Sequence, residues 1–141
     1  MLAGFEILVA DDREAFRQPE LFPAGARFAW VKPGYDEDFL APYRFRDLYV
    51  AVVTRCWETD TAALASILRQ APLPLRYLGL MGSRRKVQRV KDELAARGVA
   101  PGGVPLHAPI GLPLGGDSPG EIAISVLAEI LSVRHQEAAD A

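Results

Sequence analysis

Apolar and polar positions follow one another in blocks, and the blocks predict strands separated by turns and helices. Short apolar runs bounded by charged residues, Gly or Pro lie at residues 5–10, 27–31, 49–54 and 77–81. The run 49–54 is continuous and mostly β-branched, which is typical of a strand that is covered on both faces. Residues 104–107 predict a short edge strand, because a proline is tolerated at an edge. A single helical turn is expected over residues 36–40, before Pro42.

Apolar positions also recur at helical spacing in three stretches, 59–71, 83–97 and 118–135. Thr59 and Asp60 are expected to cap the first of these helices. Gly98 marks the end of the second helix, since glycine readily takes the left-handed conformation that follows a helix. Ser118 and Glu121 have the spacing of a capping box at the start of the third helix. Its tail, from residue 136 onward, is expected to be frayed.

This alternation of strands with helices or crossovers predicts an α/β fold: a single domain over residues 1–141, three-layered and Rossmann-like, with a mainly parallel sheet. The sequence has no Gly-x-Gly-x-x-Gly turn and opens with a strand that ends in acidic residues, the usual second strand of such a fold. We therefore expect the sheet to be incomplete at its first β-α unit. An open strand edge is costly, so we expect rearrangement within the chain or another chain to cover it, most simply in a homodimer.

Composition narrows the functional classes. The 141 residues are half apolar and 24% charged, with a net charge of −2, so no basic character points to nucleic acid. No apolar run approaches the roughly 20 residues of a membrane span, and the N-terminus has no signal-peptide pattern. Cys56 is the only cysteine, which excludes an internal disulfide and argues against a metal-ligand cluster. We expect a cytoplasmic protein.

The segment from Leu75 to Lys86 has the sequence of a buried strand that turns sharply into a charged helix. Gly79 and Gly82 allow close approach of the backbone, and Ser83 opens the helix. The first amides of a helix have no intrahelical partner and attract anions, here with Arg84 beside them. A plain strand-to-helix turn with a serine cap is the alternative.

Several other polar residues suit either a site or a structural role. Asp11 and Asp12 end the first strand and predict acceptors for a ligand hydroxyl, with a solvated turn or helix cap as the alternative. Solvated helix positions are the more common fate of residues such as Arg85 and Lys86. Glu129 suits either a charge on a helix face or a buried partner for a basic side chain. The two histidines, His107 and His135, are expected to be structural or solvated.

Three motifs together resemble the C-terminal Rossmann-like domain of the XdhC/CoxI family, the xanthine dehydrogenase accessory proteins. They are Asp11 to Arg13, Tyr77 to Lys86, and Ala108 to Leu112 followed by Ser118 to Ile130. The resemblance covers Gly4 to Arg134. It implies a role in maturing molybdenum hydroxylases of the xanthine or CO dehydrogenase type, by binding molybdenum cofactor (molybdopterin) or a nucleotide and helping its sulfuration or insertion. The apoenzyme would be one partner, and a separate chain supplying the N-terminal half another.

The cofactor-binding residues that the motifs and the resemblance suggest are Asp11, Asp12, Thr54, Cys56, Gly79, Gly82, Ser83, Arg84 and Gly111. Cys56 would carry sulfur or bind molybdenum as a thiolate, unless it is only a small buried hydrophobe. Arg55 stands where family members tend to have a histidine. Two other functions stay open: an oxidoreductase that uses NAD(P), and a scaffold that docks a partner without a ligand. Whether the chain is an enzyme is left open by the sequence.

Overall fold

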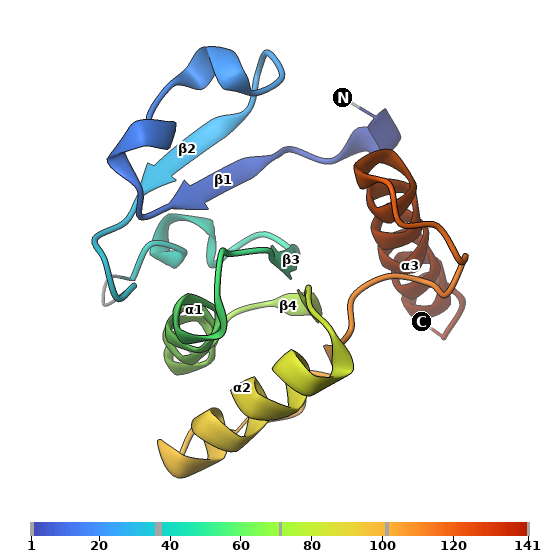
Figure 1. Cartoon of the computed structure of the whole chain (residues 1–141). Coiled ribbons are helices and arrows are strands. Elements are labelled where there is room, and N and C mark those ends of the chain that lie inside the picture. The colour runs from blue at the N-terminus through green and yellow to red at the C-terminus, as the bar shows by residue number, and fades with distance from the viewer. Residues whose placement is uncertain (1, 36–37, 71, 101, 141) are drawn as a thin grey trace.

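The computed structural model describes residues 2–35, 38–70, 72–100 and 102–140 (Figure 1). Its strands are β1 (Leu8–Asp11), β2 (Arg27–Trp30), β3 (Leu48–Val52), β4 (Leu75–Leu80) and β5 (Leu106–His107). Its α-helices are α1 (Trp57–Arg69), α2 (Arg84–Ala96) and α3 (Pro119–Asp140). Short 3-10 turns lie at Leu2–Gly4, Glu14–Phe16, Pro19–Leu21 and Ala41–Tyr43. Each strand that the sequence pattern predicted is present, with bounds shifted by a few residues.

Every strand pair is parallel, as predicted, but the strands do not form one continuous sheet. β1 pairs with β2, while β3, β4 and β5 form a separate sheet in that order. No ladder joins β1 to β3 within the described residues, although Figure 1 shows β1 between β2 and the three-stranded sheet. The fold is therefore α/β and Rossmann-like, with its sheet interrupted between β1 and β3. Rearrangement within the described residues does not close the interruption.

The apolar core lies where α1 and α2 pack against the three-stranded sheet. Leu78 and Leu80 of β4, Leu64 of α1 and Val90 of α2 are fully buried. The helical spacing of their apolar positions explains why α1 and α2 each bury one face. In contrast, α3 has no fully buried residue and lies to one side of the sheet (Figure 1). Within the described residues, no helix is both long enough and apolar enough to cross a membrane.

The predicted caps of α2 and α3 are confirmed. The Ser83 hydroxyl accepts a hydrogen bond from the Lys86 amide at 3.2 Å, and Gly98 follows α2 with a φ of +68°. At the start of α3, the Glu121 carboxylate accepts hydrogen bonds from the Ser118 amide and hydroxyl at 3.1 and 2.6 Å. Both motifs act within four residues, so local chemistry is enough to determine them.

Three local predictions need correction or fall short. α1 begins at Trp57 rather than after Thr59 and Asp60, because the Asp60 carboxylate bonds to another segment instead of capping the helix. α3 continues to Asp140, so the tail is helical and not frayed. The helical turn expected over 36–40 lies partly outside the described residues; a 3-10 turn follows at Ala41–Tyr43.

Candidate functional site

The predicted site residues follow the carboxyl ends of the parallel strands. Asp12 follows β1, Thr54 follows β3, and Gly82 follows β4. The two sheets meet at this edge, where the Asp12 and Arg55 side chains form an ion pair at 2.7 Å. In open α/β sheets, ligands bind outside the carboxyl ends of the strands. This edge is therefore the region in which to look for a site.

Each of the two acidic residues after β1 is engaged by an arginine. Arg55 donates to both carboxylate oxygens of Asp12, at 2.7 and 3.1 Å, and the Asp12 side chain is only 4% exposed. Arg13 donates to Asp11 through its backbone amide and its guanidinium at 2.7 to 3.0 Å, and these bonds lower the pKa of Asp11. A ligand hydroxyl would have to compete with these pairs. Arg55, at the position of the family's histidine, thus joins β1 to β3.

A buried ion pair connects the turn after β3 with both neighbouring helices. The Thr54 amide and hydroxyl donate to Oδ1 of Asp60 at 3.2 and 2.6 Å. Lys86 Nζ lies 2.5 Å from Oδ2 of Asp60, which is fully buried, and donates to the Met81 carbonyl. The expectation that Lys86 is solvated is therefore wrong. Its place three residues after the Ser83 cap was the available signal, because helical side chains point back toward the N-terminus.

The glycines of the β4–α2 motif have packing roles that the structure makes visible. A Cβ on Gly82 would lie 2.8 Å from Cδ of Lys86, so the absence of a side chain leaves room for Lys86 to reach Asp60. A Cβ on Gly79 would lie 2.5 Å from Cδ1 of Ile110, which packs over β4. Both glycines therefore permit close packing, and Gly79 lines neither of the cavities described below.

A second polar network, which the sequence did not reveal, anchors α3. The Tyr77 hydroxyl and the Gly111 amide both donate to Oε2 of Glu129, at 2.5 and 2.8 Å. The His107 ring stacks on Tyr77 with centroids 4.6 Å apart, and its Nδ1 lies 3.5 Å from Glu129 Oε1. Burial, together with the Glu129 carboxylate, raises the pKa of Tyr77 above its ordinary value. Glu129 is thus an acceptor for a hydroxyl and an amide beside His107, rather than a charge on a helix face.

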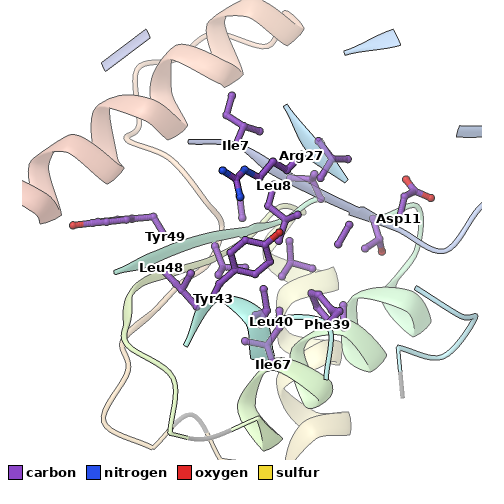
Figure 2. Close-up of a pocket in the computed structure, with 18 of the residues that line it drawn as sticks. Ile7, Leu8, Asp11, Arg27, Phe39, Leu40, Tyr43, Leu48, Tyr49 and Ile67 are labelled. Atoms are coloured by element: carbon purple, nitrogen blue, oxygen red, sulfur yellow. The ribbon is translucent and has the colours of Figure 1, made fainter. Parts of the chain in front are cut away.

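Two cavities lie near the carboxyl edge. The larger, about 1000 Å³, is bounded by β1 and β3, and Figure 2 shows Leu8 and Leu48 from the two strands among its lining. We call it the strand groove. The smaller, about 470 Å³, lies between the start of α2, the loop 109–116 and the start of α3. We call it the loop cavity. The predicted ligand cleft is therefore divided in two.

The predicted residues are distributed between these spaces. Asp11, Asp12 and Thr54 line the strand groove, whereas Gly82, Arg84 and Gly111 line the loop cavity. Gly79, Cys56 and Ser83 line neither.

Cys56 and Ser83 take part in the starts of two helices. Cys56 occupies the cap position of α1, and its Sγ lies 3.1 Å from Oγ1 of Thr59. The Ser83 hydroxyl caps α2. In the part of the chain that the structure describes, no group of three or more His, Cys, Asp or Glu side chains could hold a metal ion. The residues gathered in the loop cavity are therefore suited to binding an organic anion rather than a bare metal.

Comparison with known proteins gives a consistent result. Residues 1–130 match the family profile described as the XdhC Rossmann domain. The chain is 40% identical over 139 residues to "Uncharacterized protein YqeB" of Escherichia coli K12, covering 95% of this chain and 24% of that protein. It is 33% identical over 138 residues to a probable xanthine dehydrogenase subunit of Bacillus subtilis 168, covering 96% and 38%. The chain thus spans about a quarter to two fifths of the length of these curated relatives.

A solved structure supports the same relationship. The crystal structure of a xanthine dehydrogenase from Bacillus halodurans superposes with a TM-score of 0.72 and 27% sequence identity. The match covers 94% of this chain and 36% of that one.

Proposed function

Because this chain belongs to the XdhC Rossmann-domain family, we propose that it helps mature a molybdenum hydroxylase of the xanthine dehydrogenase type. Its cargo is molybdenum cofactor, which it holds and passes to the apoenzyme. The main support from the structure is the loop cavity, where a helix N-terminus, an arginine and a glycine-rich loop come together. The cavity is stronger support than the fold, since a Rossmann-like fold hosts many activities.

One side of the loop cavity suits a phosphate group. Arg84 lines it, and no described residue pairs with the Arg84 guanidinium. The first amides of α2 have no intrahelical partner, and the positive end of the helix dipole points the same way. Gly82, beside Arg84, leaves the backbone accessible to an anion.

The opposite side suits a ring that carries N–H donors. Ile110 and Leu112 provide apolar walls, and Glu121 provides an acceptor. The hydrogen bonds from Ser118 lower the pKa of Glu121 and keep it ionised near neutral pH. A carboxylate would repel a second phosphate but accept hydrogen bonds from a pterin amine. The chemistry of these side chains therefore fits a ligand with an anionic end and a donor-rich ring, as molybdenum cofactor has. When delivered, that cofactor supplies the client enzyme with its redox metal.

The test is an anaerobic calorimetric titration of the purified chain with molybdenum cofactor and, separately, with NAD⁺ and NADP⁺. The decisive variant is Arg84→Gln, which removes the charge but keeps a polar side chain. Its matched control is Arg85→Gln, because Arg85 is the next residue on α2, is exposed, and lines neither cavity. A hydrogen bond to a charged group contributes about 1.5–3 kcal/mol, so the Kd of Arg84→Gln should rise at least about tenfold.

The control Arg85→Gln should bind within about twofold of the wild type, because long-range surface charge is screened by salt. Binding of NAD⁺ or NADP⁺ alone would refute the proposal and favour an oxidoreductase. Binding of none of these ligands would favour a docking scaffold. Equal loss of affinity in both variants would mean that general positive charge, and not the loop cavity, attracts the ligand.

A further inference from the structure

The strand groove separates two strands that run in the same direction. Before the strands begin, Glu6 and Arg46 form an ion pair at 2.6 Å. After they end, Asp12 and Arg55 form the ion pair at 2.7 Å. Because like ends are joined to like ends, β1 and β3 are parallel across the groove. Figure 2 agrees, with Leu8 and Asp11 in the same order along β1 as the course of β3.

Each of these strands has only one hydrogen-bonded neighbour among the described residues. The carbonyls of Ile7 and Asp11 accept from amides at the two ends of β2, and the carbonyl of Val52 accepts from the residue after β4. Alternate residues of a parallel strand direct their amides and carbonyls to opposite neighbours. The backbone groups of Leu8 and Ala10 therefore face the groove.

The same alternation applies to β3, where Tyr49, Ala51 and Val53 direct their backbone groups to the groove. Ala51 is exposed and the Val53 side chain is 54% exposed, in a strand whose sequence is that of a covered one. Two facing rows of backbone donors and acceptors thus lack a ladder partner in the part of the chain that the structure describes. Such edges are templates for another strand.

The groove has the character of a space for one strand. Its volume is about 1000 Å³, the upper end of ordinary ligand pockets, and it is elongated along two strand edges. Its apolar lining includes Leu8, Ala10, Leu40, Val50, Val52 and Ile67. A strand between two others needs about 9.6 Å, twice the roughly 4.8 Å spacing of a sheet. Long arginine side chains bridge the gap at both ends, as expected where the strands are too far apart to pair directly.

We propose that the strand groove binds an apolar strand of five or six residues from a partner polypeptide, parallel to β1 and β3. The inserted strand would pair with Leu8 and Ala10 on one side and with Tyr49, Ala51 and Val53 on the other. It would join the two sheets into one six-stranded parallel sheet. This inference concerns the groove alone and does not rest on the proposed cofactor function.

A second copy of the chain fits the groove less well than a single strand does. The outer edges of a copy belong to β2 and β5, and each would bring its own hydrogen-bonded neighbour into a space one strand wide. A symmetric dimer pairing like edges would bring those strands together antiparallel, on one wall of the groove only. A small molecule could fill the apolar space but could not satisfy both rows of backbone groups.

The test uses the full chain and a synthetic peptide with six alternating valine and isoleucine residues, flanked by lysines and blocked at both termini. Binding is followed by amide hydrogen exchange in NMR. Without peptide, the amides of Ala10 and Ala51 should exchange rapidly, whereas those of Val9 and Val52, which point into existing ladders, should be protected. At a peptide concentration about 100 times its Kd, exchange at Ala10 and Ala51 should slow about 100-fold.

The matched control peptides carry N-methyl groups. Methylating alternate residues within the strand removes the donors on one of its edges, and each of the two alternate sets should raise the Kd at least about tenfold. Methylating a flanking lysine should change the Kd less than twofold. On the protein, Ala51→Pro removes a groove-facing donor at an edge that tolerates proline and should abolish binding, whereas Ala51→Val should retain it. Circular dichroism checks that both variants fold.

Equal binding of the methylated and unmethylated peptides would overturn the proposal, because backbone pairing would then not hold the strand. Rapid exchange at Ala10 and Ala51 in saturating peptide would also overturn it. Protection of these amides without peptide, rising with protein concentration as dimers form in sedimentation, would assign the groove to a second copy instead. The methylated peptides keep the test decisive even if Ala51→Pro fails to fold.

Discussion

Replacing Lys86 by methionine should destabilise this protein more than any other single change on the surface of α2. Methionine keeps most of the length and apolar surface of the side chain but removes its charge. Asp60, fully buried beneath it, would then have no counter-ion. The Oδ2 atom of Asp60 has no hydrogen-bond partner among the described residues, so the contact with Lys86 is its only compensation.

The expected magnitude follows from the burial of the two partners. Breaking a buried ion pair by removing one partner typically costs about 3–5 kcal/mol. The Lys86 side chain is 25% exposed, and the two hydrogen bonds from Thr54 to Oδ1 would remain, so the lower end of that range applies. We expect the free energy of unfolding to fall by about 3 kcal/mol. That is a large part of the roughly 5–15 kcal/mol that stabilises a typical domain.

The assay is urea unfolding followed by far-ultraviolet circular dichroism, with the free energy extrapolated to water. Arg85→Met is the matched control, since it removes a neighbouring exposed charge and should change stability by less than about 0.5 kcal/mol. Asp60→Asn provides the complementary variant. Its amide oxygen can still accept from Thr54, and Lys86 can extend into solvent, so the loss should be smaller than for Lys86→Met.

Two results would refute this reasoning. If Lys86→Met and Arg85→Met have the same stability, the ion pair does not hold the helices in place. If Asp60→Asn is the more costly change, the hydrogen bonds from Thr54, and not the charge of Lys86, are the dominant contribution.

Two further predictions concern the loop cavity and the turn before α1. A Cβ on Gly111, at a φ of +96°, would lie 2.5 Å from Ser125 Oγ, so Gly111→Ala should lower the thermal midpoint more than Gly115→Ala, which has a similar φ but open space. Burial and the nearby carboxylates raise the pKa of Tyr35 to about 12. The raised pKa favours the neutral form, so its contribution to stability is complete below pH 10 and is lost toward pH 12; Tyr35→Phe should reduce this alkaline loss in unfolding experiments.

The elements that could be predicted from the sequence are those whose cause is local. The run 49–54 indicates a covered strand because of its composition alone, and Ser83 and Ser118 cap helices through groups within three residues. Parallel pairing follows from the alternation of strands with helices or crossovers. The family resemblance, which rests on the same segments, is confirmed by the match over residues 1–130.

The contacts that could not be predicted join residues far apart in the sequence. Asp12 and Arg55 are 43 positions apart, and Tyr77 and Glu129 are 52 apart. Hydrophobic periodicity indicates which face of an element is buried but not which polar side chains meet across elements. The early start of α1 has the same cause, since Asp60 is a good cap by composition but uses its carboxylate for Thr54.

The loop cavity and the strand groove differ in how far each depends on the interrupted sheet. The loop cavity is built on β4, whose ladders to β3 and β5 are both present. Its walls are tied together by the bonds from Gly111 to Glu129, from Ile110 to the Leu80 carbonyl, and from Leu112 to the Ser125 carbonyl. None of these bonds involves β1 or β2. A ligand can therefore bind beside Arg84 whether or not a strand fills the groove, because the geometry of that cavity is determined by the complete part of the fold.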